Sequence, residues 1–302
     1  MNKSLKNLIA IFFLFFILIK GAYSMQYVKY IVEYQSNNVG CTILVNDVKA
    51  LWNNDYQGPM MAGVTMSAFL GNGINTISLN MVPISSIKEG YKNYQSNSSC
   101  ELIGSKIILH ETSKDEIELF KLIGSVDEDL QPTGKQSPNY EDNQVVEYPI
   151  DGTDFYQVSK SFVMNGLPEW TWTKAISFEP TEENMQKLRE AYLEVWQAIN
   201  TKNEQRFKEL SYISFSEKEL AANYPGSWYV SLDLDKLLAR SHGAMPINWD
   251  DYKLVILNKE KLVKLENEQG FSPLGFKNQD DKLITSYNPY FSLIDNKMVL
   301  TR

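Results

Sequence analysis

The chain has 302 residues, a formal net charge of −8 and 12% aromatic residues. That aromatic content argues against intrinsic disorder, because disordered chains have too few apolar groups to build a core. The acidity argues against a nucleic-acid binder, since such proteins present a basic face to phosphates. It also argues against an anionic membrane surface as the partner.

Residues 1–24 are typical of a secretory signal peptide. Lys3 and Lys6 form a positive start, 12 consecutive apolar residues follow, and Ala22 and Ser24 have the spacing that a signal peptidase recognises. We predict cleavage after Ser24, a periplasmic or secreted location, and no membrane span in the mature protein. The apolar run is shorter than the roughly 20 residues that cross a bilayer, and an uncleaved anchor is the alternative. Cleavage removes three lysines, so the mature charge is −11.

Cys41 and Cys100 are the two cysteines of the sequence. In an exported chain a lone pair most often forms one disulfide, which we predict here. Two buried free thiols are the alternative. The pair alone does not make a structural zinc site, because zinc takes four ligands there.

Short strands separated by turns are predicted over residues 25–124. Apolar and polar residues alternate along 26–36, and turn residues occur at 37–40, 46–47 and 71–73. The other predicted strands are 41–45, 48–51, 63–70, 74–81, 102–103, 106–110 and 117–123. Short strands at this spacing are typical of a β-sandwich.

Part of this segment resembles the jelly-roll accessory domains found on glycoside hydrolases. The stretches Val45-Asn46-Asp47-Val48 and Leu70-Gly71-Asn72-Gly73-Ile74-Asn75-Thr76-Ile77 follow their V-N-G-x … L-x-x-G-x-N-x-I-x-V pattern, with Asp47 where Gly is usual. The resemblance covers residues 41–81 and implies a jelly-roll-like sandwich. It implies little about a ligand, because glycine and asparagine are mainly turn residues.

Residues 125–153 are rich in acids, prolines and glycines, which predicts a long acidic loop or a linker between two domains. Loops of this length are more often functional or mobile than structural. We therefore take its exposed acids as candidates for binding a partner: Asp127, Glu128, Asp129, Glu141 and Asp142.

Residues 154–302 are predicted to form an α+β domain. Apolar residues at helical spacing between 185 and 199 predict a long amphipathic helix of about five turns. A second helix is predicted at 206–210, and Ser216-Glu217-Lys218-Glu219 predicts a capping box that opens a third. After Pro225-Gly226 the pattern predicts an antiparallel sheet. Its strands are 252–257, 262–265, 291–294 and 298–301, with turns at 258–260 and 295–296.

No residue pattern for catalysis stands out, and we expect no catalytic residues, no cofactor and no metal site. His110 and His242 are expected at the surface or in capped positions. The stretch 270–275 has one residue too many for a G-x-S-x-G elbow, and Ser85-Ser86-Ile87-Lys88 lacks the K-T-G partner of an S-x-x-K motif. The sequence leaves open a pair of carboxylates that meet in space, as in glycoside hydrolases.

Three tryptophans are further candidates for contact with a partner. Trp170 and Trp172 alternate in a predicted strand, so both side chains would lie on one face. They are either a platform for sugar rings or a protein, or residues of the core. Trp52 precedes a polar loop and is expected at the surface.

An exported chain without recognisable chemistry is expected to be a binding protein. A one-disulfide sandwich joined to an α+β domain, with strong negative charge, resembles the layout of periplasmic immunity proteins that neutralise type VI secretion toxins. The resemblance implies a non-enzymatic inhibitor with a basic protein partner, bound through the acidic loop and exposed aromatic residues. Two alternatives stay open: a module that binds glycans or the cell envelope, and an enzyme with a pocket in the C-terminal domain.

Overall fold

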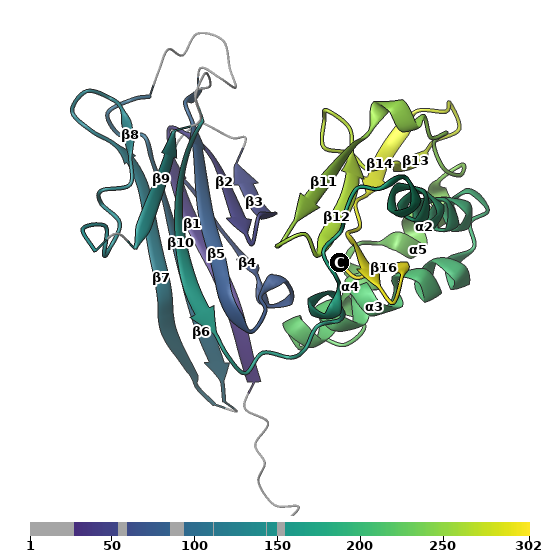
Figure 1. The fold of residues 1–302 in the computed structure, drawn as a ribbon, viewed down its shortest axis with the longest axis horizontal. Helices are drawn as coiled ribbons and strands as arrows, with labels where there is room; N and C mark the ends of the chain where they lie inside the picture. The colour runs from purple at the N-terminus through teal and green to yellow at the C-terminus, as the bar shows by residue number, and fades with distance from the viewer. Residues whose placement is uncertain (1–26, 54–58, 85–93, 111, 143, 150–154) are drawn as a thin grey trace, which may run out of the picture.

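The computed structural model describes residues 27–53, 59–84, 94–110, 112–142, 144–149 and 155–302. A β-sandwich extends to Met164, and an α+β part follows beside it (Figure 1). The predicted fold class, a mainly β protein with an α+β part, is confirmed. The predicted signal peptide of residues 1–24, with its cleavage site after Ser24, lies outside the described residues.

Two five-stranded antiparallel sheets form the sandwich. Their strand orders are β4-β1-β6-β7-β8 and β3-β2-β5-β10-β9. A short 3-10 helix, η1 (Ser67–Phe69), follows β4. The strands are β1 (Tyr27–Asn37), β2 (Gly40–Val45), β3 (Val48–Asn53), β4 (Met60–Thr65), β5 (Gly73–Val82), β6 (Ser99–Leu109), β7 (Lys114–Val126), β8 (Pro132–Thr133), β9 (Val145–Pro149) and β10 (Tyr156–Met164).

Alternation along the strands decides which face each sheet buries. In β1 the side chains of Val32 and Tyr34 are buried, while Glu33 between them is exposed. Successive side chains of a strand point to opposite faces, so the apolar set of β1 meets Leu79 and Met81 of β5 in one core. The sandwich predicted from the period-2 pattern therefore follows from burial of one face per sheet.

The predicted disulfide between Cys41 and Cys100 is present and joins the two sheets. Cys41 lies on β2, Cys100 is the second residue of β6, and their Cα atoms are 6.3 Å apart. Both residues are buried in the sandwich core. The bond closes a loop across a sequence separation of 59 residues, so it fixes the two layers relative to each other.

Replacing both cysteines by alanine should lower the free energy of unfolding by about 4 kcal/mol, because the unfolded chain regains the entropy of that loop. Chemical unfolding of the C41A/C100A variant measures the change. Reductant should destabilise the wild type by a similar amount and leave the variant unaffected. Equal stability of the wild type with and without reductant would contradict the prediction.

The segment 125–153 is not a linker between domains, and this part of the sequence prediction is wrong. Its described strands belong to the sandwich: β8 pairs with β7, and β9 pairs with β10. Strand β10 in turn pairs with β5 along its whole length. The boundary therefore lies after Met164 and not at residue 154. Buried Tyr156 and Val158 explain the difference, because they complete the sandwich core.

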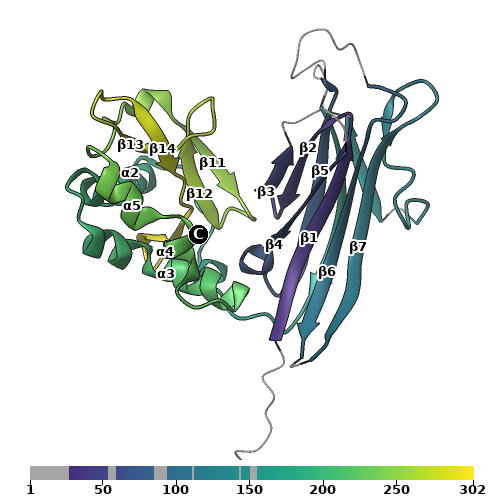
Figure 2. The same cartoon turned by 180° about the vertical axis from the view of Figure 1, so that it is seen from behind.

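The second part packs helices against a four-stranded sheet of order β11-β12-β15-β16 and a hairpin of β13 and β14 (Figures 1 and 2). Of the helices that the structure describes, none combines the length and the apolar composition that crossing a bilayer requires. The helices of the second part are η3 (Thr171–Lys174), α2 (Glu182–Asn200), α3 (Glu204–Ala222), α4 (Ser227–Ser231), α5 (Leu234–Arg240) and η4 (Trp249–Asp251). Its strands are β11 (Lys253–Leu257), β12 (Leu262–Glu266), β13 (Leu274–Lys277), β14 (Leu283–Tyr287), β15 (Phe291–Ile294) and β16 (Lys297–Leu300).

The long helix α2 is the predicted amphipathic helix. The Thr181 hydroxyl accepts a hydrogen bond from the Asn184 amide at 3.2 Å and caps its first turn. Tyr192 on its apolar face is fully buried and lies 4.8 Å from Phe291, measured between ring centres. The Tyr192 hydroxyl also accepts a hydrogen bond from the Leu265 amide of β12 at 2.9 Å. Tyr192 thus contacts the sheet through both its ring and its hydroxyl.

Two predictions for the second part are wrong. Residues 204–222 form one helix, α3, and Ser216 does not cap a new one: its hydroxyl donates to the Ile213 carbonyl, as happens inside a continuing helix. Glu219, the acid that would complete the box, therefore lies near the end of α3 and not in a first turn. After Pro225-Gly226 the chain forms α4 and α5 before any strand.

Candidate functional site

The five acids predicted to bind a partner are all exposed. They lie in two groups, Asp127 to Asp129 between β7 and β8, and Glu141 with Asp142 before β9. Strands β7 and β8 lie on the side of the sandwich away from the second part (Figures 1 and 2). The second part therefore leaves this surface uncovered.

Hydrogen bonds to the backbone fix the first acidic group. Asp127 Oδ1 accepts from the Asp129 amide at 3.0 Å and from the Gln131 amide at 2.9 Å. A short side chain that bonds to the amides two residues on is a standard turn element. Ser137 holds the following stretch to β7, since its hydroxyl accepts from the Ile123 amide at 2.9 Å and donates to the Ile123 carbonyl at 3.1 Å.

Glu147 holds the stretch from Gly134 to Tyr140, and no pattern in the sequence indicates this role. Its carboxylate accepts hydrogen bonds from the Gly134 amide, the Tyr156 hydroxyl and the Tyr140 hydroxyl, the last at 2.9 Å. Burial opposes ionisation of Glu147, but these hydrogen bonds outweigh it and hold the pKa of the carboxyl below its ordinary value. A charged, fully bonded carboxylate therefore joins the loop to β9 and β10.

The negative charge is concentrated in the sandwich. Residues 25–164 contain 17 Asp and Glu against 9 Lys, whereas residues 165–302 contain 20 acids against 17 Lys and Arg. Most of the excess charge thus belongs to the part that carries the acidic loop. A basic partner would approach this part of the molecule preferentially.

Trp170 and Trp172 are core residues and not an exposed platform, which corrects their place among the partner-binding candidates. Their side chains are 2% and 4% exposed, respectively. Residues 171–174 form the 3-10 helix η3, so the predicted strand is wrong as well. Trp52 lies on β3 opposite Thr42, and the description does not extend to its side chain.

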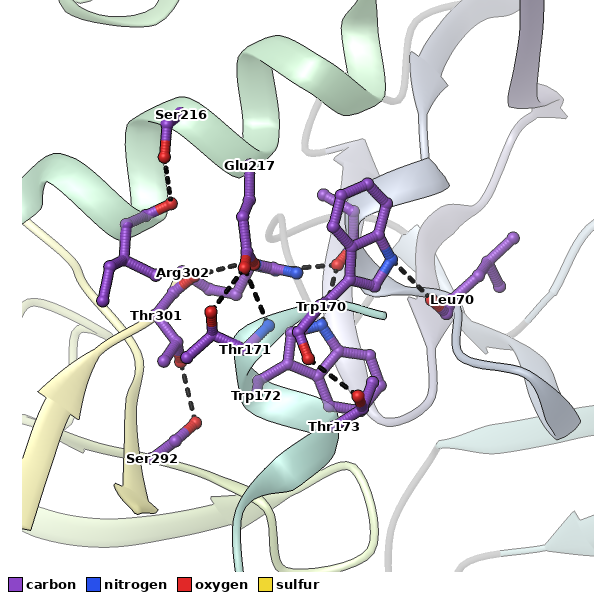
Figure 3. Close-up of polar contacts among 12 residues, drawn as sticks. Leu70, Trp170, Thr171, Trp172, Thr173, Ser216, Glu217, Ser292, Thr301 and Arg302 are labelled. Atoms are coloured by element: carbon purple, nitrogen blue, oxygen red, sulfur yellow. Dashed lines mark hydrogen bonds and ion pairs between the residues drawn. The ribbon is translucent and has the colours of Figure 1, made fainter. Parts of the chain in front are cut away.

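Both indoles bind the sandwich through carbonyl groups of the segment around η1. Trp170 Nε1 donates to the Leu70 carbonyl at 2.9 Å, and Trp172 Nε1 donates to the Ala68 carbonyl at 3.0 Å (Figure 3). A buried indole N–H needs an acceptor, and here the other part of the molecule supplies it. The two tryptophans therefore belong to the contact between the sandwich and the α+β part.

Arg302 lies at the centre of this contact. Its Nε donates to the Ala68 carbonyl at 2.7 Å, and its Nη1 donates to Glu217 Oε2 at 2.5 Å (Figure 3). The guanidinium carbon lies 5.4 Å from the ring centre of Trp170 and 5.9 Å from that of Trp172. Glu217 Oε1 in turn accepts from the Thr171 amide at 2.7 Å and from its hydroxyl at 2.6 Å. We call Arg302, Glu217, Trp170, Trp172 and Thr171 the junction cluster.

The charge on Arg302 is retained despite burial. Burial lowers the pKa of its guanidinium to about 10, and the hydrogen bond and charge of Glu217 act in the opposite direction. The group is therefore still protonated at neutral pH. An arginine can serve this role because its planar group bonds to a carboxylate and a carbonyl while it lies over aromatic rings.

Removal of Glu217 should destabilise the protein strongly. The E217A variant leaves the Arg302 guanidinium buried without its counter-charge, which costs about 3–5 kcal/mol in the free energy of unfolding. The double variant E217L/R302M should lose much less than the two single variants together, since it leaves no charge unpaired. Chemical unfolding of E217A measures the first loss, and chemical unfolding of the wild type, E217L, R302M and E217L/R302M measures the cycle. A loss below about 1 kcal/mol for E217A, as for an exposed ion pair, would contradict the assignment.

Lys218 follows Glu217 on α3, and the positive charge of Arg302 in the junction cluster acts on it. Its Nζ lies 5.0 Å from the ring centre of Trp228. Burial, together with the positive charge of Arg302, lowers the pKa of Lys218 to about 7. The protonated form of this lysine is thus disfavoured in the folded protein.

The free energy of unfolding should therefore increase as the pH rises from about 7 to about 10. In that range the unfolded chain, with its lysine pKa near 10.4, holds a proton that folded Lys218 has released. The K218M variant should lose this rise, whereas K282M at an exposed lysine should keep it. Thermal unfolding across this pH range is the measurement. The same pH dependence in the wild type and K218M would contradict the prediction.

No group of three or more His, Cys, Asp or Glu is placed to hold a metal ion within the part of the chain that the structure describes. His110 is paired with Asp115 at 3.0 Å at the surface. No family model, curated protein or solved structure matches the chain.

Proposed function

We propose that the protein is an exported, non-enzymatic binding protein, and more specifically an inhibitor of the immunity-protein kind that binds and neutralises a basic secreted toxin. The observation that carries the proposal is the acidic loop. Its five carboxylates are exposed, while Asp127, Ser137 and Glu147 hold its backbone in place. The secretory character of residues 1–24 and the disulfide agree with action outside the cytoplasm.

The physical advantage of this loop is that little of it has to become ordered on binding. Ordering flexible side chains and loops opposes association, so a loop already fixed by hydrogen bonds keeps more of its interaction energy. Complementary charge adds faster encounter and rejection of acidic proteins. Both effects favour a protein partner with a basic surface over a neutral one.

Neutralising the loop should slow association with the partner about tenfold at low salt, because the steering charge is lost. The test variant is E128Q/E141Q/D142N. The control is E190Q/E268Q/D280N, which makes the same chemical changes at exposed acids of the second part. Secreted basic proteins of bacteria that share the habitat, together with the product of the adjacent gene, are the candidate partners for surface-based binding measurements.

The proposed inhibitor function also requires that the protein protects cells against the toxin. Periplasmic co-expression with the candidate toxin should restore growth for the wild type and for the control variant, and should restore it less for the loop variant. Equal association rates for all three proteins would remove the acidic loop as the contact. Failure to restore growth with any bound basic protein would refute the inhibitor function itself.

A further inference from the structure

A cleft of about 380 Å³ lies between the sandwich and the second part, next to the junction cluster. One wall comes from the sandwich and includes Asn46, Asn72 and Asn75. The other comes from Asn258, Lys259 and Lys261 of the turn between β11 and β12. Residues 168–174, which include Trp172, complete the lining. The cleft is thus built from both parts and exists only in their present arrangement.

The sandwich wall has little hydrogen-bonding capacity left. Asn46 Nδ2 donates to the Phe69 carbonyl at 2.8 Å and to Asn75 Oδ1 at 2.9 Å, and its Oδ1 accepts from the Thr76 amide at 2.9 Å. Asn75 Nδ2 donates to the carbonyls of Gly71 and Gly73. Both amide N–H bonds of each side chain are therefore already used. These asparagines, which carry the jelly-roll resemblance, support the turns and form a rigid wall.

The opposite wall has hydrogen-bond donors without acceptors. Lys259 Nζ donates to the Ile74 carbonyl at 2.9 Å, and Lys261 Nζ donates to the Thr173 carbonyl at 2.5 Å. An ammonium has three N–H bonds, so each of these bonds orients a lysine and leaves two more donors. Lys174 adds a third, exposed ammonium.

The lining of the cleft also carries a net positive charge, which favours a ligand that is both an anion and a hydrogen-bond acceptor. Three lysines face one carboxylate, Glu169, among the lining residues of a chain whose net charge is −8. Trp172 offers no open ring face, since it is 4% exposed, so recognition here depends on hydrogen bonds and charge.

We propose that this cleft binds a small molecule that carries an oxyanion, a carboxylate or a phosphate, such as a sugar acid or a sugar phosphate. The oxyanion accepts from the ammonium groups of Lys174, Lys259 and Lys261. The cleft volume is at the lower end of the range for small-molecule sites, about 300–1,000 Å³, which suits one sugar ring better than a chain of them. This site is independent of the proposed function, because the acidic loop takes no part in it.

Calorimetric titration of the whole protein at low salt tests the site. The probes are glucuronate, glucose 6-phosphate, inorganic phosphate and neutral glucose. We expect one-to-one binding of glucuronate or glucose 6-phosphate, at least tenfold tighter than that of glucose. The two acidic probes distinguish carboxylate from phosphate, and binding of inorganic phosphate alone would also support recognition of the oxyanion. Absence of binding by every anionic probe up to about 10 mM, or equal binding of glucose, would overturn the proposal.

Three variants locate the binding. K174Q and K259Q each remove an exposed charge of the cleft lining without touching the core. Each should weaken binding of the preferred probe about tenfold, the effect of one charged hydrogen bond. K297A removes a lysine on β16, outside the cleft, and should bind as the wild type does. Unchanged binding in K174Q, or the same loss in K297A, would contradict the site.

Discussion

A buried guanidinium lies at the centre of the contact between the two parts of this protein. Arg302 belongs to the second part, yet it donates to the Ala68 carbonyl of the sandwich and to Glu217 of α3. Moving a charge out of water is unfavourable by several kcal/mol unless it is paired and hydrogen-bonded, so the arrangement is tolerated only when all these partners are in place. Small apolar residues from both parts, Val48, Ala68 and Ala221, surround the indoles and exclude water from the contact. The ion pair thus selects one relative position of the two parts, whatever its net contribution to stability.

The same contact explains why the two candidate binding regions lie where they do. Trp172 belongs both to the junction cluster and to the lining of the cleft. The contact that joins the two parts therefore also sets the width of the cleft. The acidic loop is attached to β7, β9 and β10 and lies away from this contact (Figure 1). A large partner at the loop and a small molecule in the cleft would therefore not compete for space.

Local patterns predicted much of the fold. The strands of the sandwich, the turns at Asn46-Asp47 and Asp295-Asn296, and the helix α2 follow from alternation, turn chemistry and helical spacing, all of which act over a few residues. The sequence predictions were wrong where contacts between residues far apart in the chain determine the structure. Ser216 and Glu219 have the spacing of a capping box, but α3 continues through both of them, and its Phe207 and Phe215 pack against the distant Tyr287. Likewise, buried Tyr156 and Val158 draw β10 into the sandwich, although the acids and prolines before them are typical of a linker. No local pattern could reveal the cleft, because it forms where the two parts meet.

The most direct test of this account is the distribution of distances between the two parts in solution. Spin labels at exposed Ser161 on β10 and exposed Glu190 on α2, read by pulsed electron resonance, would report it. The account predicts one narrow distance for the wild type and a broad distribution once Glu217 and Arg302 are both replaced. A broad distribution in the wild type, or a narrow one that survives loss of the pair, would contradict the claim that this buried charge fixes the arrangement.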